Sequence, residues 1–286
     1  MRNKPESGRA WSLPKTTLAY LMVIPFVYPL LFLLATAMRT TDAYNRSPLG
    51  FSGFPTLSHL RYAWGAGSLG RGVVNSLIAV PVGVVCCCTV SSMAAYWFFR
   101  HRGKIAKVLL SLILIGWVVP FAVYLVPFYI EMVQFNLTDN LFMLGLAYGA
   151  LSTPFGIYFV LAYLRQAVPT ELLEAASVDG ASIVRQFFRI VLPLARPAIG
   201  TLAALSFVGM WGDVLLSVVM LGTDPGKFTI VLSANALVGQ TVAASGSINT
   251  VQTVAAATFI SLLPMLAIVY FAQRAIVRGF SAGALR

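Results

Sequence analysis

The chain has 286 residues, of which 58% are hydrophobic and only 10% charged, whereas a soluble globular domain is about 25% charged. This composition excludes an ordinary soluble enzyme and a disordered chain, and it predicts an all-α polytopic membrane protein. The net charge is +11. Because the Lys and Arg residues lie between apolar segments, they indicate the cytoplasmic ends of membrane helices and not a nucleic-acid partner.

Six apolar segments are long enough to cross the hydrocarbon core, which takes roughly 20 residues. The predicted transmembrane helices are Thr17–Met38, Val73–Phe99, Val108–Ile130, Leu141–Leu164, Pro197–Leu221 and Val254–Ala272. Prolines lie inside several of them, at Pro25, Pro29, Pro81, Pro120, Pro127, Pro154 and Pro264. Since neighbouring helices re-satisfy the carbonyls that proline frees, these prolines predict kinks and not breaks.

The distribution of positive charge predicts the orientation. With a cytoplasmic N-terminus, the inner segments carry fifteen Lys and Arg residues and the outer segments carry five. The positive-inside rule therefore places both termini in the cytoplasm. The longer outer segments are then 39–71 and 222–250, which we expect to be loops, and the longest inner segment is 165–196.

The inner segment 165–196 carries the most informative pattern. Residues 170–178 predict a short helix, and Asp179-Gly180 predicts a turn, because glycine readily takes a positive φ. A second helix follows, in which Ile183, Phe187, Ile190 and Leu194 form one apolar stripe. An interfacial helix that only lies on the membrane is the alternative, but such a helix requires neither an acidic first turn nor the tight turn at Gly180.

The same segment resembles a known family. Glu174-Ala175-Ala176, Asp179-Gly180 and Ile190-x-Leu192-Pro193 are similar in type and spacing to the EAA loop of binding-protein-dependent ABC importer permeases. The six spans resemble the carbohydrate-uptake branch, specifically its smaller, maltose-permease-G-like subunit. Trp211-Gly212-Asp213 resembles the Trp-Asn-Asp/Glu element of that branch, with Gly212 in place of the Asn, and residues 280–285 resemble its C-terminal ending.

The resemblance implies a type I ABC importer permease fold in which the EAA loop forms a cytoplasmic coupling helix. Residues 1–71 would hold the N-terminal cytoplasmic segment, the first span and an outer loop. Residues 72–273 would form the transmembrane core with the coupling loop 165–196, and residues 274–286 a cytoplasmic tail. The residues that would couple this chain to an ATPase subunit are Glu174, Ala175, Ala176, Asp179, Gly180, Ile190, Leu192 and Pro193.

The resemblance also implies the partners. They are a second permease subunit, two ATPase subunits and an extracytoplasmic sugar-binding protein, assembled in a bacterial or archaeal cytoplasmic membrane. The sequence contains no G-x-x-x-x-G-K-[ST] motif. We therefore expect this chain to be no enzyme and to bind no cofactor, with ATP and Mg²⁺ held by the ATPase subunits.

The implied cargo is a sugar, in particular a di- or oligosaccharide, and glycerol-3-phosphate or a related polar organic phosphate is the alternative within the family. An ion-coupled secondary transporter is an alternative of another class. It would show internal repeats and paired broken helices with intramembrane acids. The sequence has no such repeat, and it places one acid, Asp213, inside a span.

Few intramembrane side chains suit a substrate pathway. Because an intramembrane charge is costly, we expect Asp213 to face water or the bundle interior, either as a pathway residue or as a helix-packing partner. Asn75 is a weaker case of the same kind. Five aromatic side chains could stack on a sugar ring, although Tyr and Trp also gather at membrane interfaces: Trp117, Tyr124, Tyr129, Tyr148 and Trp211. We predict neither a catalytic nor a metal site, because the sequence shows no cluster of His, Cys, Asp or Glu with suitable spacing.

Overall fold

The computed structural model describes residues 13–51, 53, 55–65, 68–222, 224–243 and 250–284. Predictions for the segment 1–12, for part of the last outer segment (244–249) and for the last two residues of the tail lie outside these residues. Within the described part of the chain all regular structure is helical, as the composition predicts. The elements are α1 (Leu13–Ala37), α2 (Thr41–Arg46), α3 (Ser58–Gly65), α4 (Leu69–Arg100), α5 (Lys104–Val118), α6 (Phe121–Gln134), α7 (Leu141–Ala167), α8 (Thr170–Val178), α9 (Ile183–Gln186), the π-helix η1 (Phe187–Val191), α10 (Leu192–Trp211), α11 (Leu215–Leu221), the 3₁₀ turn η2 (Pro225–Lys227), α12 (Ile230–Ala243) and α13 (Thr250–Ala284).

The prediction of a six-span membrane protein agrees with this structure. Among the described residues, five helices are long and apolar enough to cross a bilayer, and the bent pair α5–α6 makes a sixth span if it is one segment. Most of the prolines named above lie inside helices, as predicted.

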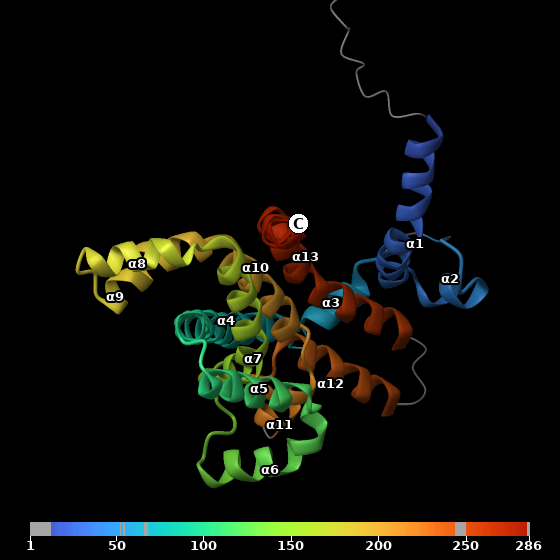
Figure 1. Cartoon of the computed structure of the whole chain (residues 1–286). Coiled ribbons are helices and arrows are strands. Elements are labelled where there is room, and N and C mark those ends of the chain that lie inside the picture. The colour runs from blue at the N-terminus through green and yellow to red at the C-terminus, as the bar shows by residue number, and fades with distance from the viewer. Residues whose placement is uncertain are drawn as a thin grey trace, which may run out of the picture.

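The centre of the bundle is the pair α4 and α7, against which α10 packs, with α13 beyond α10 (Figure 1). Glycines let the two central backbones approach closely. A Cβ added at Gly145 would lie 2.6 Å from the carbonyl oxygen of Ala79, and one added at Gly83 would lie 2.9 Å from the carbonyl oxygen of Gly145. The α4–α7 contact is therefore a backbone-to-backbone contact of the kind that small residues permit in membranes.

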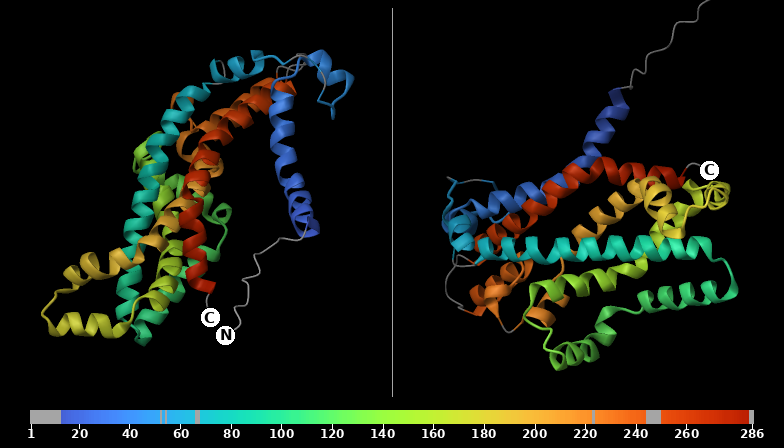
Figure 2. Two further views of the ribbon diagram at one scale, coloured as in Figure 1. Left: turned by 90° about the horizontal axis from the view of Figure 1, so that it is seen from above. Right: turned by 90° about the vertical axis from the view of Figure 1, so that its left-hand side faces the viewer.

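Figure 2 shows how the elements divide between the two ends of the bundle. The hairpin of α8 and α9 projects from one end, and the last turns of α13 and the first turns of α1 lie toward that same end. The helices α2 and α3 lie at the opposite end. The structure thus places the helix ends nearest to both termini on the side of the inner segment 165–196.

The predicted third span is broken and not merely kinked. The helices α5 and α6 meet at an angle of 95°. Pro120 has no N–H to continue α5, and its ring disfavours the helical conformation for the preceding residue. Val119 accordingly takes an extended ψ of 121°. The prediction that Pro120 only kinks the third span is therefore wrong.

The predicted fifth span also differs from the structure. Instead of running from Pro197 to Leu221, the helix continues from the inner segment without a break at Pro193 and ends at Trp211, and α11 begins as a separate helix at Leu215. Asp213 therefore lies in the break between two helices and not inside a span. The outer segments predicted as loops contain α2, α3 and the 14-residue α12.

The apolar stripe predicted for the second inner helix is correct at Phe187, which is buried, and at Ile190, which is partly buried, but wrong at both of its ends. Ile183 is 55% exposed and Leu194 is 40% exposed, whereas Phe187, Val191 and Ala195 are buried. The π-helix η1 explains the difference at Leu194, because a wider turn shifts the side chains that follow it around the helix axis. Ile183 lies before η1, and on that turn Gln186 is buried instead. From the end of η1 onward, the residues that face the bundle are Val191 and Ala195, each one position after the predicted Ile190 and Leu194.

Candidate functional site

Residues 170–186, here called the elbow, form a short helical hairpin outside the bundle (Figure 1). Gly180 takes a φ of +77°, as the sequence predicts for the turn. The Ala181 N–H donates to the Ala176 carbonyl (2.9 Å), and the Ser182 hydroxyl accepts from the Arg185 N–H (3.3 Å) to begin α9. The turn is therefore set by its own backbone and by one side-chain cap.

The tip of the elbow exposes the residues that begin the EAA pattern. Glu174, Ala175, Asp179 and Gly180 are exposed, and Ala176 is partly buried. Large apolar side chains are exposed beside them, with Val178 88% exposed and Val184 and Phe188 also facing outward. An apolar surface rimmed by acids and standing clear of the bundle is typical of a protein-interaction site.

The remaining residues of the pattern lie elsewhere. Ile190 is in η1, and Leu192 and Pro193 are at the start of α10, all partly buried in the helix that leads into the membrane. The pattern thus divides into an exposed tip and a stem. The tip can meet a partner, and the stem connects that tip to the membrane helix.

Gln186 attaches the elbow to the bundle, and sequence reasoning missed it. This side chain is 1% exposed. Its Nε2 donates to the Ser177 hydroxyl (3.0 Å) and to the Ala181 carbonyl (2.9 Å), while its Oε1 accepts from Arg100 Nη1 (2.6 Å) and from the Tyr96 hydroxyl (3.3 Å). One amide therefore joins both arms of the elbow to the C-terminal end of α4.

No charge or motif marks Gln186 in the sequence. The only signal in the sequence is that an uncharged polar residue precedes Phe187. In the structure Phe187 is buried against Tyr96, with ring centroids 5.5 Å apart. Because the predicted stripe placed Ile183 and not Gln186 against the bundle, that signal was not interpretable from the sequence.

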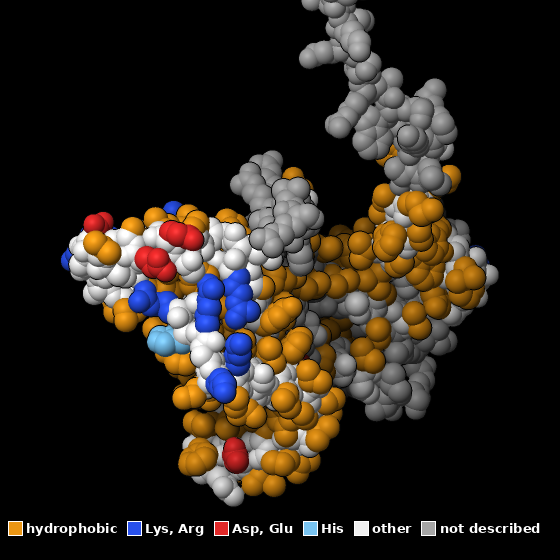
Figure 3. Space-filling view, viewed as in Figure 1, with side chains coloured by type: hydrophobic (Ala, Val, Ile, Leu, Met, Phe, Trp, Pro, Cys, Tyr) orange, Lys and Arg blue, Asp and Glu red, His pale blue; other side chains and the backbone are white. Residues whose placement is uncertain are grey.

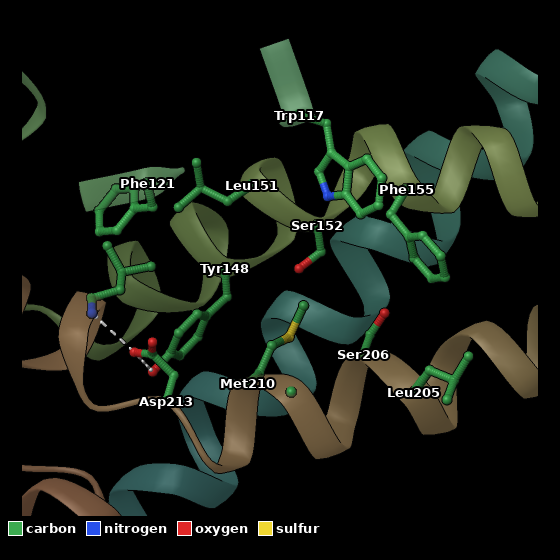
Figure 4. A pocket seen from close by; sticks show the side chains of 12 residues that line it. Trp117, Phe121, Tyr148, Leu151, Ser152, Phe155, Leu205, Ser206, Met210 and Asp213 are labelled. Atoms are coloured by element: carbon green, nitrogen blue, oxygen red, sulfur yellow. Dashed lines mark hydrogen bonds between the residues drawn. The ribbon is translucent and has the colours of Figure 1, made fainter. Parts of the chain in front are cut away.

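A cavity of about 430 Å³ opens between α7, α10 and the α5–α6 bend (Figure 4). Its wall combines aromatic rings with a few hydroxyl groups and one carboxylate. The residues that carry this chemistry are Trp117, Phe121, Tyr148, Ser152, Phe155, Ser206 and Asp213. Apolar walls with a few placed polar groups are the usual composition of a small-molecule site.

Asp213 lies at one end of this cavity beside Tyr148 (Figure 4). Its Oδ2 accepts from the Tyr148 hydroxyl (3.1 Å) and from the backbone N–H groups of Leu216 (3.0 Å) and Ser217 (3.1 Å). The carboxylate thus caps α11 and also lines the cavity. Both interpretations that the sequence left open, a helix-packing partner and a pathway residue, are compatible with this position.

Of the other candidates, Trp117 and Tyr148 line this cavity, whereas Asn75, Trp211 and Tyr124 do not. Trp211 is 2% exposed, and its Nε1 donates to the Ser261 carbonyl of α13 (3.0 Å). Asn75 donates from Nδ2 to the carbonyls of Gly226 (3.1 Å) and Phe228 (2.9 Å) and so holds η2 against α4. Tyr124 packs edge-on against the cavity residue Phe121. In the described part of the chain, no group of three or more His, Cys, Asp or Glu side chains could hold a metal ion.

Known proteins resemble this chain over most of its length. The diacetylchitobiose uptake system permease protein NgcG of Streptomyces coelicolor is 27% identical, over 100% of this chain and 92% of that protein. The melibiose/raffinose/stachyose import permease protein MelC of Bacillus subtilis is 26% identical, over 95% of each. A chain from the crystal structure of a bacterial ABC transporter involved in the import of the acidic polysaccharide alginate has the same fold, with a TM-score of 0.74 and 18% identity over 96% of this chain and 99% of that one.

The match to a protein family covers the central helices, the elbow and most of the last helix. Residues 88–282 match the family described as binding-protein-dependent transport system inner membrane component. This match spans more than half of the chain and agrees with the six-span fold and the exposed elbow. The chain belongs to the binding-protein-dependent transport system inner membrane component family, whose members are the permease subunits of ABC importers.

Proposed function

We propose that this chain is one of two permease subunits of an importer that takes up a di- or oligosaccharide across a bacterial or archaeal cytoplasmic membrane. The second permease completes the pathway, two ATPase subunits bind ATP and Mg²⁺, and an extracytoplasmic binding protein delivers the sugar. This chain hydrolyses nothing and binds no cofactor. The named oligosaccharide permeases among its relatives favour a sugar over glycerol-3-phosphate, and the family favours an ABC importer over an ion-coupled transporter.

The observation that carries this proposal is the exposed tip of the elbow. Glu174, Ala175, Asp179 and Gly180 stand on a projection with exposed apolar neighbours, and the hydrogen bonds of Gln186 connect that projection to α4. A contact at the tip would therefore move with the membrane helices. We assign the tip as the surface that docks on an ATPase subunit, with Ile190, Leu192 and Pro193 in the stem that transmits its motion.

The cavity beside Asp213 is the corresponding candidate for the sugar pathway. Aromatic faces can pack against the C–H face of a sugar ring. A hydroxyl group can both accept a hydrogen bond from a sugar hydroxyl and donate one to it, and a carboxylate can accept one. Trp117, Phe121 and Phe155 supply the first kind of surface, and Ser152 and Asp213 supply the second. Trp211 and Asn75 then have a structural role outside the pathway, because each donates a hydrogen bond to a backbone carbonyl of another segment.

The elbow assignment is tested in the importer reconstituted with its partner subunits and binding protein. We expect Glu174→Lys and Gly180→Asp to leave the chain in the membrane but to abolish uptake and its stimulation of ATP hydrolysis. Glu174→Lys reverses a charge at the docking surface, and Gly180→Asp adds a charge and a side chain where φ is positive, which costs about 1–2 kcal/mol. Uptake and ATPase rates are measured together in proteoliposomes.

Two controls separate docking from misfolding. Glu131→Lys reverses an exposed charge on α6 and should transport normally. The purified chain alone should hydrolyse no ATP. Wild-type uptake and wild-type ATPase stimulation in both elbow variants would refute the assignment of the tip.

A further inference from the structure

A second cavity lies below the elbow, where α4 ends, α5 begins and α7 ends. It measures about 390 Å³, and its polar lining consists of His101, Arg102, Lys107 and Arg165. Figure 3 shows Lys and Arg side chains gathered in a row on this face, with Asp and Glu side chains on the elbow above them and hydrophobic surface below. Three cations from three helices or their connections thus converge on one hollow.

No ion pair within the described part of the chain involves these three cations, Arg102, Lys107 and Arg165. The lining contains no carboxylate. The Arg102 guanidinium lies over the Phe99 ring, 5.5 Å from its centroid, and also borders the neighbouring cavity that contains Arg100 and Glu174. The hollow is therefore a concentrated positive site with a fixed guanidinium at its rim.

The other wall of the hollow is apolar and continues into the membrane. Phe98, Ala106 and Leu110 line it. On α5 itself, Ile105, Val108 and Leu112 are exposed, as is typical of a helix face that meets lipid. A ligand that fits both walls carries a negative charge at one end and a hydrocarbon chain at the other.

We propose that this hollow binds the phosphate of an anionic phospholipid of the cytoplasmic leaflet. Arg102, Lys107 and Arg165 contact the phosphate oxygens, and the acyl chain follows Leu110 along α5. Arginine suits this task because its planar guanidinium donates two parallel hydrogen bonds to a phosphate. A basic pocket between membrane helices on the cytoplasmic side is the expected chemistry for such a headgroup. The apolar wall favours a lipid over free phosphate.

Native mass spectrometry of the detergent-solubilised full chain tests this site with phosphatidylglycerol and phosphatidylcholine as the two probes. We expect the wild-type chain to retain phosphatidylglycerol in preference to phosphatidylcholine. The double variant Arg102→Gln/Lys107→Gln should lose that preference, since each cation near an anionic lipid contributes about fivefold to its binding. The single variant Arg165→Gln, which changes a different helix, should weaken retention about fivefold.

A matched variant controls for total charge. Arg185→Gln/Arg189→Gln removes two exposed cations from the same end of the molecule, outside the hollow, and should retain phosphatidylglycerol as the wild type does. Wild-type retention in both pocket variants would overturn the proposal, and so would an equal loss in the control. Displacement of the lipid by millimolar inorganic phosphate at constant ionic strength would identify a free anion as the ligand and would also overturn it. None of these measurements requires transport, so the result is independent of the proposed function.

Discussion

The carboxylate of Asp213 accepts hydrogen bonds from the Tyr148 hydroxyl and from the two N–H groups that begin α11. The Tyr148 hydroxyl in turn lies 2.7 Å from the Ser217 hydroxyl. These contacts explain how a partly buried acid is tolerated between the two helices, because each is a charge-assisted or shared hydrogen bond that offsets the loss of water. A lone pair of the carboxylate that is not used in this way can still meet a sugar hydroxyl in the cavity.

Asp213→Asn separates these two tasks. The amide keeps an acceptor oxygen for α11 but loses the negative charge, so we expect near-wild-type folding and a lower sugar uptake. A hydrogen bond to a charged group contributes about 1.5–3 kcal/mol, against about 1 kcal/mol for a neutral one, and we expect the sugar transported per ATP hydrolysed to fall severalfold. The measurement is uptake and ATPase rate in the same proteoliposomes, with saturating binding protein.

Asp224 provides the matched control for Asp213. Its Oδ1 also accepts a backbone N–H of the following turn, from Gly226 at 2.9 Å, and it pairs with Lys227 at 3.3 Å. These hydrogen bonds from Gly226 and Lys227 lower the pKa of the Asp224 carboxyl. Asp224→Asn should leave the ratio of sugar to ATP unchanged. A wild-type ratio in Asp213→Asn as well would assign Asp213 a structural task alone.

At the scale of elements, the attachment of the elbow to α4 depends on one amide. Gln186 itself is buried, and Gln186→Leu would remove its hydrogen bonds to the Arg100 guanidinium and the Ser177 hydroxyl, both on exposed residues. Each lost hydrogen bond costs about 1 kcal/mol or more. We expect the backbone amides of the elbow to exchange with solvent at least about tenfold faster, since 1.4 kcal/mol is a factor of ten in an opening equilibrium.

Hydrogen–deuterium exchange of the solubilised chain measures this effect. Arg185→Leu is the control, because Arg185 is the exposed neighbour of Gln186 on the same turn and should leave exchange in the elbow unchanged. Equal exchange in the wild type and in Gln186→Leu would show that α8 and α9 are held by the buried Phe187 and Leu173 and not by the amide.

The elements that the sequence predicted well are those with a long apolar signal. The first, second, fourth and sixth predicted spans coincide with α1, α4, α7 and α13 to within a few residues at most ends, and the Gly180 turn has the predicted φ. The errors arise where local backbone geometry determines whether a helix continues and which face it buries. Pro120 breaks its predicted span, whereas the six other prolines lie inside continuous helices. The π-helix η1 rotates a helix face by one residue. Neither outcome is encoded in hydrophobic periodicity.

The candidate site shows the same division. The tip of the elbow was predictable because Glu174, Asp179 and Gly180 lie close together in one short segment of the chain. The sequence could name Asp213, Trp117 and Tyr148 as separate candidates, but not that they line one cavity, because Trp117, Tyr148 and Ser206 come from three helices and meet through tertiary packing. Trp211 and Asn75 are polar residues in apolar segments like Asp213, but only the three-dimensional structure shows that each has a backbone partner.

For the whole molecule, the positive-inside rule and the geometry lead to one topology. The elbow, the first turns of α1 and the last turns of α13 lie toward one end, and α2 and α3 lie at the other. The inner segments carry most of the Lys and Arg residues, so the elbow end should be cytoplasmic. This assignment requires the bent pair α5–α6 to cross the membrane, because otherwise α7 would begin on the wrong side.

Cysteine labelling with a membrane-impermeant maleimide tests that topology in a chain whose Cys86, Cys87 and Cys88 are replaced by Ala. Three exposed positions serve as sites, namely Leu49 before α3, Phe135 after α6 and Val178 on the elbow. We expect Leu49→Cys and Phe135→Cys to react in intact spheroplasts, and Val178→Cys to react only after permeabilisation. Labelling of Phe135→Cys only after permeabilisation would make α5–α6 a re-entrant hairpin, because a chain that turns back at Pro120 returns to the side from which it entered. Labelling of Val178→Cys in intact spheroplasts would invert the whole chain and remove the elbow from the reach of any ATP-hydrolysing partner.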